Sequence, residues 1–144
     1  MAAPAFPMTD PVGATCYRVL YGDTDAGGVV YYGAYLRFLE MGRTEFMREM
    51  ALPYSLVEQQ GILMPVTECH VLYRSSAKYD DLLRIETSLA RLKKASCTFH
   101  YRILREGDPS PFLVTGATTH AAVNEKGRPV PLPRVLVEQL SRFV

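Results

Sequence analysis

Residues 21–50 read YGDTDAGGVVYYGAYLRFLEMGRTEFMREM. The first part is a compact turn, residues 22–28, that holds two carboxylates, Asp23 and Asp25, among three glycines. The second part predicts one long helix from about Tyr31 to Met50. A carboxylate on a tight loop can act as a base or a nucleophile, and the free N–H groups of a helix N-terminus can stabilise an oxyanion. This stretch is therefore the candidate catalytic site.

The predicted helix is apolar over more than half of its circumference. One face recurs at steps of four and three residues: it consists of Tyr35, Leu39, Gly42, Phe46 and Met50. The roughly opposite polar face consists of Arg37, Glu40, Thr44 and Arg48. The flanks carry Leu36, Phe38, Met41 and Met47. Such a helix should be wrapped by a sheet or shared with a second subunit, and Gly42 would let another backbone approach closely.

Length and composition indicate one soluble globular domain. The chain has 144 residues, of which 48% are hydrophobic and 22% charged, with a net charge of +1. This balance gives no argument for nucleic acid or a membrane surface as partner, and no apolar run is long enough for a transmembrane helix. Residues 1–14 lack the basic and apolar regions of a secretion signal and predict a flexible leader. A single domain is expected over residues 15–144.

Neither the cysteines nor the histidines form a recognisable ligand set. Cys16, Cys69 and Cys97 are odd in number and widely spaced, which argues against a zinc site or a disulfide framework. Three buried thiols in a reducing cytosol are expected, and hence a cytoplasmic protein. The histidines are scattered over predicted strands and are each expected to be buried and neutral or exposed: they are His70, His100 and His120. No metal site is predicted.

Strand patterns occur on both sides of the long helix. Strands are predicted at residues 15–21, 62–75, 82–92, 96–105 and 112–124, and short helices at 54–60 and 131–144. Most connections between the strands are short turns, which require antiparallel neighbours. The sequence therefore predicts an α+β fold in which one antiparallel sheet curls around one long buried helix.

Several of these residues resemble the signature of the 4-hydroxybenzoyl-CoA thioesterase family and of the Tol-Pal-associated acyl-CoA thioesterases, both of the hotdog-fold superfamily. The matching positions are Arg18-Val19, Thr24-Asp25, Gly28-Val29-Val30, Tyr35, Arg43-Thr44, Gly61, Pro65 and Tyr79-Asp80-Asp81. The resemblance covers residues 15–125. It implies a hotdog fold with a five-stranded sheet, hydrolysis of an acyl-CoA, no cofactor besides the coenzyme A of the substrate, and a homodimer or homotetramer.

The resemblance also implies roles for individual residues. Asp25 matches the catalytic carboxylate, and the backbone N–H that polarises the thioester carbonyl falls on Tyr32, in the first helical turn. Lys93 and Lys94 match the basic residues near the coenzyme A phosphates. The Tol-Pal-associated branch usually has His in place of Tyr32, and the hydroxybenzoyl branch has Asn in place of Ala34. These differences concern which acyl group the enzyme prefers, short-chain or aromatic. They do not change the match at Asp25.

Each candidate residue also has a plainer interpretation. Asp25 could be a turn or capping residue, and Asp23 is expected to brace the turn. Glu40 is either a solvated or interface residue or a contact to the acyl group. Met64 lines the pocket or packs in the core, and Lys93 and Lys94 could be solvated charges.

Two other functions remain open at this stage. A hotdog dehydratase or hydratase also acts on acyl-CoA, but it typically needs a His close to its acid on the loop, and residues 21–35 contain none. A non-catalytic acyl-CoA binding module would keep the pocket and the lysines without needing Asp25. A phosphate-cradling loop is disfavoured, because GDTDAGG fits neither glycine-rich pattern and two carboxylates repel phosphate.

Overall fold

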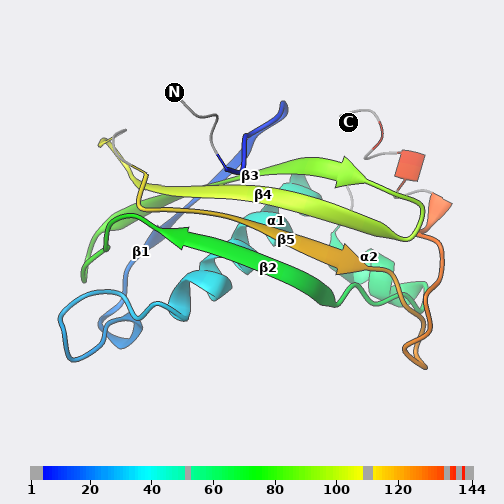
Figure 1. Ribbon diagram of the computed structural model, residues 1–144, viewed down its shortest axis with the longest axis horizontal. Helices are drawn as coiled ribbons and strands as arrows, with labels where there is room; N and C mark the ends of the chain where they lie inside the picture. The colour runs from blue at the N-terminus through cyan, green and yellow to red at the C-terminus, as the bar shows by residue number, and fades with distance from the viewer. Residues whose placement is uncertain (1–4, 51–52, 109–111, 135–136, 139–140, 142–144) are drawn as a thin grey trace.

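The computed structural model describes residues 5–50, 53–108, 112–134, 137–138 and 141. Its helices are α1 (Ala34–Glu49) and α2 (Tyr54–Gln59), and a short 3-10 turn covers Tyr21–Asp23. Its strands are β1 (Gly13–Arg18), β2 (Val66–Tyr73), β3 (Leu82–Leu92), β4 (Ser96–Arg105) and β5 (Val114–Ala121). Figure 1 shows the long sheet with α1 running beneath it.

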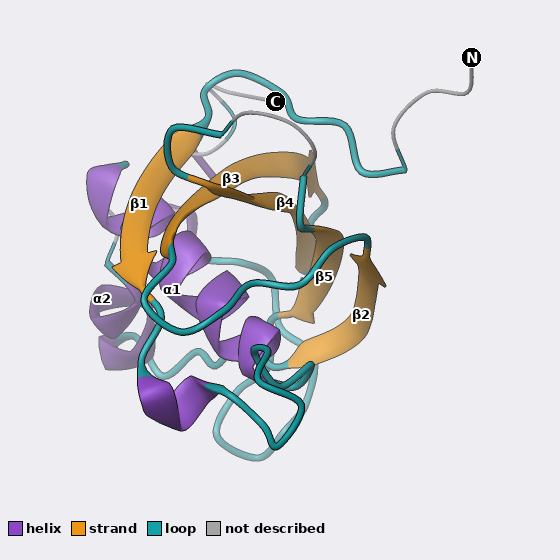
Figure 2. Ribbon diagram, turned by 90° about the vertical axis from the view of Figure 1, so that its left-hand side faces the viewer, coloured by secondary structure: helices purple, strands orange, loops and turns teal. Residues whose placement is uncertain are grey.

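The five strands form one antiparallel sheet in the order β1-β3-β4-β5-β2. Seen from the side, the sheet curls around α1 (Figure 2). This arrangement confirms the predicted α+β architecture of the hotdog type. The strands predicted at 82–92 and 96–105 coincide with β3 and β4.

The core lies between the concave face of the sheet and α1. Phe38, Leu39 and Phe46 of the helix are almost completely buried, as are Leu83 and Ile85 of β3. Period-two alternation points these strand residues at the helix. Most of the predicted apolar face of the helix therefore faces the sheet.

Gly42 lies where α1 approaches β3 most tightly, as its place on the apolar face predicts. A Cβ added there would be 2.5 Å from the Thr87 hydroxyl oxygen and 2.8 Å from a methyl carbon of Ile85. No real Cβ tolerates such distances, so the missing side chain sets how close the helix lies to the sheet.

Two element boundaries around the acidic turn differ from the predictions. β1 ends at Arg18 instead of residue 21, because the Asp23 carboxylate accepts the Leu20 N–H at 2.8 Å and folds the chain into the 3-10 turn. The long helix begins at Ala34 instead of Tyr31, because the Tyr31 N–H donates to the Asp23 carbonyl at 2.8 Å and keeps this segment outside the helix.

Smaller differences concern the ends of the outer strands and the C-terminal helix. β2 and β5 are shorter than the predicted 62–75 and 112–124. Helical hydrogen bonds join the Val137 N–H to the Pro133 carbonyl and the Ser141 N–H to the Val137 carbonyl. Residues 135–136, 139–140 and 142–144 of the predicted terminal helix lie outside the described residues.

The described part of the chain contains no helix with the length and apolar character needed to span a membrane. The cysteines are free thiols, but the prediction that all three are buried is wrong. Cys97 points into the core, whereas Cys16 lies on edge strand β1 and Cys69 on edge strand β2, where both are exposed.

Candidate active site

The acidic turn is a small closed loop that presents Asp25. Its ends are joined by an isolated antiparallel bridge between Thr24 and Val30. Inside it the Asp25 N–H donates to the Val29 carbonyl at 2.9 Å, and the Gly28 N–H donates to the Asp25 carbonyl at 3.0 Å. Gly28 has φ 79°, a left-handed conformation that favours glycine. The loop backbone is therefore fixed by its own hydrogen bonds.

The Asp25 carboxylate is exposed and only half engaged. Its Oδ1 accepts the Gly27 N–H at 2.8 Å, which holds the side chain in an Asx turn. Within the described residues, no hydrogen bond or ion pair involves Oδ2. One oxygen is thus held in place while the other is available to a substrate or a water molecule.

Asp23 is the structural partner in this pair of carboxylates. It is buried and accepts hydrogen bonds from the Tyr17 hydroxyl at 2.7 Å and the Leu20 N–H at 2.8 Å, and it pairs with Arg37. Burial acts to raise the pKa of Asp23, but these hydrogen bonds and the Arg37 charge outweigh it and leave the pKa lowered. The expectation that Asp23 braces the turn agrees with these contacts.

The chain enters α1 beside Asp25. The sequence placed Tyr32 in the first helical turn. In the structure it lies in the turn that precedes the helix. Neither the Tyr32 N–H nor the Gly33 N–H donates a hydrogen bond within the described part of the chain. The Tyr73 hydroxyl, on β2, donates to the Tyr32 carbonyl at 3.0 Å and anchors this turn. The free N–H groups are therefore available to an oxyanion.

Asp25 and Tyr32 line one cavity of about 270 Å³. Tyr35 from α1 and Tyr73 from β2 form its aromatic side, with their ring centroids 5.6 Å apart. The structure therefore brings the predicted carboxylate and the predicted N–H donor to the same cavity.

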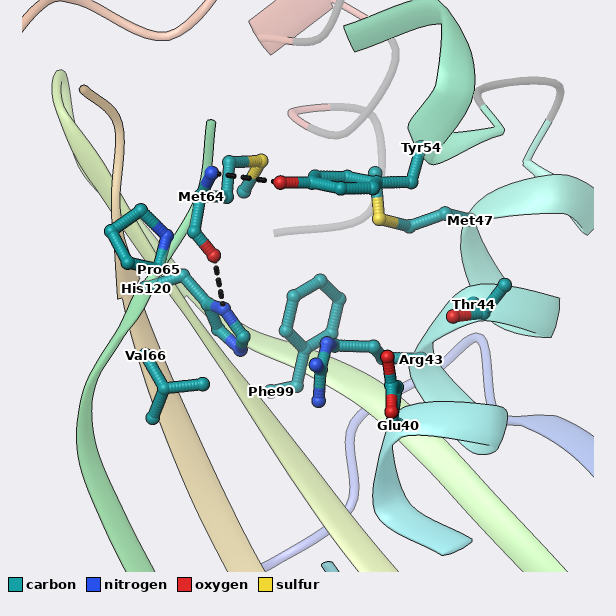
Figure 3. A pocket seen from close by; sticks show the side chains of 10 residues that line it. All are labelled: Glu40, Arg43, Thr44, Met47, Tyr54, Met64, Pro65, Val66, Phe99 and His120. Atoms are coloured by element: carbon teal, nitrogen blue, oxygen red, sulfur yellow. Dashed lines mark hydrogen bonds between the residues drawn. The ribbon is translucent and has the colours of Figure 1, made fainter. Parts of the chain in front are cut away.

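Glu40 and Met64 line a second cavity of about 270 Å³, between the middle of α1 and the start of β2. Figure 3 shows the side chains around it. Glu40 is exposed at its edge and Met64 is largely buried. The two cavities share no lining residue, so the structure does not join Glu40 and Met64 to Asp25 within one chain.

Arg43 and His120 also line the second cavity, and the sequence assigned neither of them a role in the site. Arg43 lies one helical turn beyond Glu40, and this i, i+3 spacing could have placed both on the same side of the helix. His120 comes from β5, and only the strand pairing brings it to the helix.

Lys93 and Lys94 are exposed in the turn between β3 and β4. Their backbone is held by bonds from the Lys93 N–H to the Ser96 carbonyl and from the Leu132 N–H to the Lys94 carbonyl, both 2.8 Å. This turn is at the opposite end of the sheet from the acidic loop (Figure 1). Within one chain the two lysines and Asp25 are not brought together.

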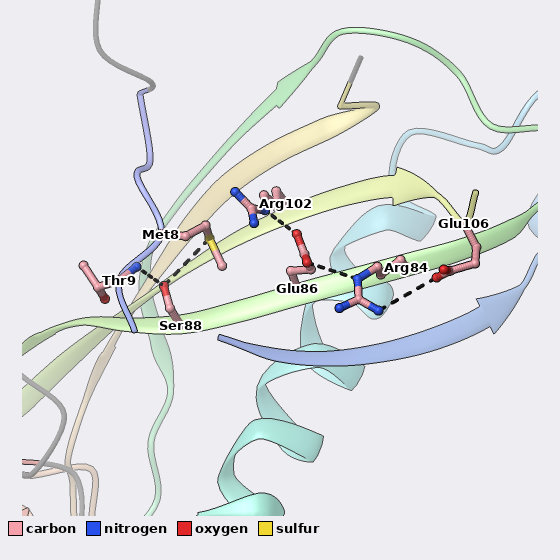
Figure 4. Close-up of polar contacts among 7 residues, drawn as sticks. All are labelled: Met8, Thr9, Arg84, Glu86, Ser88, Arg102 and Glu106. Atoms are coloured by element: carbon pink, nitrogen blue, oxygen red, sulfur yellow. Dashed lines mark hydrogen bonds and ion pairs between the residues drawn. The ribbon is translucent and has the colours of Figure 1, made fainter. Parts of the chain in front are cut away.

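A third polar cluster lies on the outer face of the sheet, away from α1 (Figure 4). Buried Glu86 pairs there with Arg84 and Arg102. Burial acts to raise the pKa of Glu86, but the two guanidinium groups outweigh it and lower the pKa. Nearby, the Thr9 N–H donates to the Ser88 hydroxyl at 3.3 Å. This cluster is fully paired and offers no reactive group.

No group of three or more His, Cys, Asp or Glu side chains suited to a metal ion occurs among the described residues.

The family model of the thioesterase-like superfamily matches residues 19–140. Over 120 residues the chain is 38% identical to the acyl-CoA thioesterase YbgC of Haemophilus influenzae, covering 81% of this chain and 85% of that protein.

Two further comparisons agree with this match. The chain is 28% identical over 91 residues to the 4-hydroxybenzoyl-CoA thioesterase of Pseudomonas sp. strain CBS-3, covering 61% of this chain and 64% of that protein. Among solved structures, the hypothetical protein TT1821 of Thermus thermophilus superposes with a TM-score of 0.85 at 32% identity, covering 92% of this chain and 98% of that chain.

Proposed function

This chain belongs to the thioesterase-like superfamily, and on that premise we propose that it is an acyl-CoA thioesterase that hydrolyses a short-chain or aromatic acyl-CoA to the free acid and coenzyme A. One observation carries the proposal. The half-engaged carboxylate of Asp25 and the unbonded N–H of Tyr32 line the same cavity at the start of α1.

Thioester hydrolysis needs a polarised carbonyl, an activated oxygen nucleophile and a leaving thiolate. The Tyr32 N–H donates to the carbonyl oxygen, and its hydrogen bond strengthens as negative charge develops there, which contributes about 3 kcal/mol. Because a thiolate leaves readily, the site needs no strong general acid. No cofactor is required, since coenzyme A is part of the substrate.

Asp25 can act in two ways. As a general base, it takes a proton from water while the water oxygen attacks the carbonyl carbon. As a nucleophile, its free Oδ2 attacks the carbonyl and expels the thiolate, and water then hydrolyses the mixed anhydride. In both routes the C–S bond breaks, and the carboxylate is regenerated at the end.

The proposed substrate reaches beyond the Asp25 cavity. We assign the acyl group to the cavity lined by Glu40 and Met64, and the coenzyme A phosphates to Lys93 and Lys94. Because these groups are separated from Asp25 within one chain, we assign the complete site to a homodimer or homotetramer, in which a second copy supplies the missing parts. The free cysteines fit a reducing compartment, and we assign the enzyme to the cytoplasm.

Two alternatives predict different chemistry. A dehydratase or hydratase would use a histidine beside its acid, but the one histidine lining the cavities described above, His120, is buried and already bonded through both ring nitrogens. A non-catalytic binding module would bind acyl-CoA without releasing thiol.

The test is a panel of acyl-CoA thioesters of increasing chain length together with aromatic ones. Release of free coenzyme A, followed with a thiol reagent, should be enzyme-dependent for at least one class and should yield the matching free acid. Binding without thiol release would support the binding module. Formation of a double bond or a hydroxyl on the acyl chain would support the dehydratase or hydratase.

A further inference from the structure

Arg43 is an unpaired cation inside the second cavity. It projects from α1 toward Phe99 and His120 (Figure 3). Within the described part of the chain it takes part in no ion pair, and its one polar side-chain neighbour is the neutral hydroxyl of Tyr101, whose hydrogen bond with Arg43 acts to lower the pKa of Tyr101. Three further arginines of the described residues have no hydrogen-bond or ion-pair partner for their side chains, and all three are exposed to water: they are Arg74, Arg91 and Arg128. Arg43, by contrast, is half-buried. A sheltered guanidinium is costly unless an acceptor meets it.

The floor of the cavity supplies no anionic acceptor, only the neutral Tyr101 hydroxyl. The Met64 carbonyl can only accept, so His120 donates to it from Nδ1 at 3.1 Å. His120 Nε2, which then carries no proton, accepts from the Thr118 hydroxyl at 2.8 Å. The Thr118 oxygen in turn accepts from the Tyr101 hydroxyl at 2.6 Å. His120 and Thr118 are therefore satisfied within the floor, and Tyr101 can offer Arg43 only a lone pair of its neutral hydroxyl.

The floor also carries no compensating negative charge. Burial, together with the nearby Arg43 charge, lowers the pKa of His120 against the effect of its bond to Met64, so the ring is neutral at pH 7. Burial raises the pKa of the Cys97 thiol to about 12 and raises that of Tyr101, although Arg43 acts to lower both. Both groups therefore stay neutral. Glu40 is exposed to water and more than 4.0 Å from the Arg43 guanidinium.

Apart from Thr44 and the Glu40 carboxylate at the exposed edge, the remaining walls are mostly apolar. Met47, Phe99 and Val66 contribute hydrocarbon and sulfur surface, and the ring of Tyr54 covers one end, with its hydroxyl accepting the Met64 N–H at 2.9 Å. A cavity of about 270 Å³ with mostly apolar walls, one sheltered cation and its one carboxylate, Glu40, at the exposed edge fits a short apolar chain that ends in an anion.

We propose that Arg43 determines the acyl specificity of this cavity by binding a carboxylate at the far end of the acyl group, so that the preferred substrate is the mono-CoA thioester of a dicarboxylic acid. This inference rests on the proposed function. A guanidinium has five N–H donors and no acceptor, so a carboxylate engages it through two parallel bonds and neutralises it, while a hydroxyl engages one donor.

The experiment compares pairs of straight-chain acyl-CoA esters of equal length that end in a carboxylate or in a methyl group. A series of lengths is needed, because the Arg43 cavity and the Asp25 cavity share no lining residue within one chain. At the best length, wild type should hydrolyse the carboxylate ester with a kcat/KM about tenfold or more above that of its methyl partner.

Three variants isolate the cation. Arg43→Gln should lower kcat/KM for the carboxylate ester by about 10- to 100-fold and leave the methyl ester within about twofold. Arg43→Lys keeps the charge, so its kcat/KM for the carboxylate ester should lie between the values of wild type and Arg43→Gln. Arg48→Gln removes an exposed cation of the same helix and should change neither ester. Equal losses on both esters in Arg43→Gln, or a wild-type preference for the methyl ester, would overturn the inference.

A binding measurement separates this inference from the proposed function. Thioether analogues of the same pairs cannot be hydrolysed, and calorimetry gives their affinities. Tighter binding of the carboxylate thioether by wild type than by Arg43→Gln supports the Arg43 assignment even if neither ester is hydrolysed, in which case the thioesterase proposal alone fails. Equal affinities in the two proteins overturn the Arg43 assignment, whatever the activity.

Discussion

Asp23 and Asp25 lie two residues apart in one turn, yet their surroundings give them different roles. Asp23 is buried under three donors that hold it charged, whereas Asp25 is exposed and keeps one oxygen free. The sequence predicted that Asp23 braces the turn, which agrees with its contacts, and that Asp25 is the catalytic carboxylate, which stays a prediction. Arg43 matched the family signature but was given no role, because an arginine on a helix is usually solvated, and its sheltered position depends on β2 and β4 folding over it.

Asp23→Asn should destabilise the protein by about 2 kcal/mol, because hydrogen bonds to a charged group are lost at a buried position. The pKa of Asp23 is lowered in the folded state, so its stabilisation is present above its unfolded pKa, about 3.9, and is lost as the pH falls through the folded pKa. Urea unfolding should show the difference at pH 7 and a smaller one in acid. Asp25→Asn in the same turn is the control; an equal loss there would contradict this account.

At the scale of elements, the sequence predicted β3, β4 and most of α1 closely, because their hydrophobic periods are long and unbroken. It could not predict the strand order. The rule that short connections join neighbouring strands does not hold for β2 and β3, since residues 74–81 link one edge of the sheet to an interior strand beside β1. This crossover depends on the pairing of β2 with β5, which local sequence does not encode.

Gly42→Ala tests how tightly α1 packs on β3. Alanine favours a helix by about 1 kcal/mol over glycine, but overpacking costs about 1–3 kcal/mol, and a Cβ 2.5 Å from Thr87 makes the second effect win. The variant should unfold at a lower temperature. The buried Thr87 hydroxyl has no partner in the described structure, so adding Thr87→Ala should restore part of the loss. A gain in stability from Gly42→Ala alone would show that the helix can shift freely.

At the scale of the whole molecule, a single chain separates parts of the proposed site and leaves an exposed edge on the sheet. β2 is an edge strand with Val66, Leu72 and Tyr73 exposed. Unpaired edges of this length are usually covered or blunted. The turn between β3 and β4, which carries Lys93 and Lys94, lies at the opposite end of the sheet from the acidic loop (Figure 1). The sequence predicted a homo-oligomer with each site built from two subunits, and the separation of these residues within one chain agrees with that expectation, which itself stays a prediction.

We expect light scattering at micromolar concentration to give a mass at least twice the 16.1 kDa of one chain. Leu72→Glu should shift the population toward monomer and reduce activity, because it places a charge on the exposed edge. Leu56→Glu on α2 is the matched control, since the two leucines are 43% and 42% exposed. An active wild-type monomer would remove the idea of a shared site.

Changing Lys93 and Lys94 together to Glu should raise KM for a full acyl-CoA by about tenfold, because attraction to the phosphates becomes repulsion. The effect should shrink in high salt, while turnover at saturation changes much less. A truncated thioester that lacks the nucleotide is the control and should hardly respond. Equal losses on both substrates would mean that the lysines act on folding or assembly.

The catalytic role of Asp25 is tested most directly by the turnover of Asp25→Asn on the best acyl-CoA of the panel. The amide keeps the shape of the side chain but is a poor base and nucleophile, so turnover should fall by a factor equivalent to at least about 3–4 kcal/mol, with an unchanged melting temperature. Asp10→Asn, outside the site, should be fully active. If the Asp25→Asn variant keeps more than about a tenth of wild-type turnover, the assignment of Asp25 as the catalytic group is contradicted.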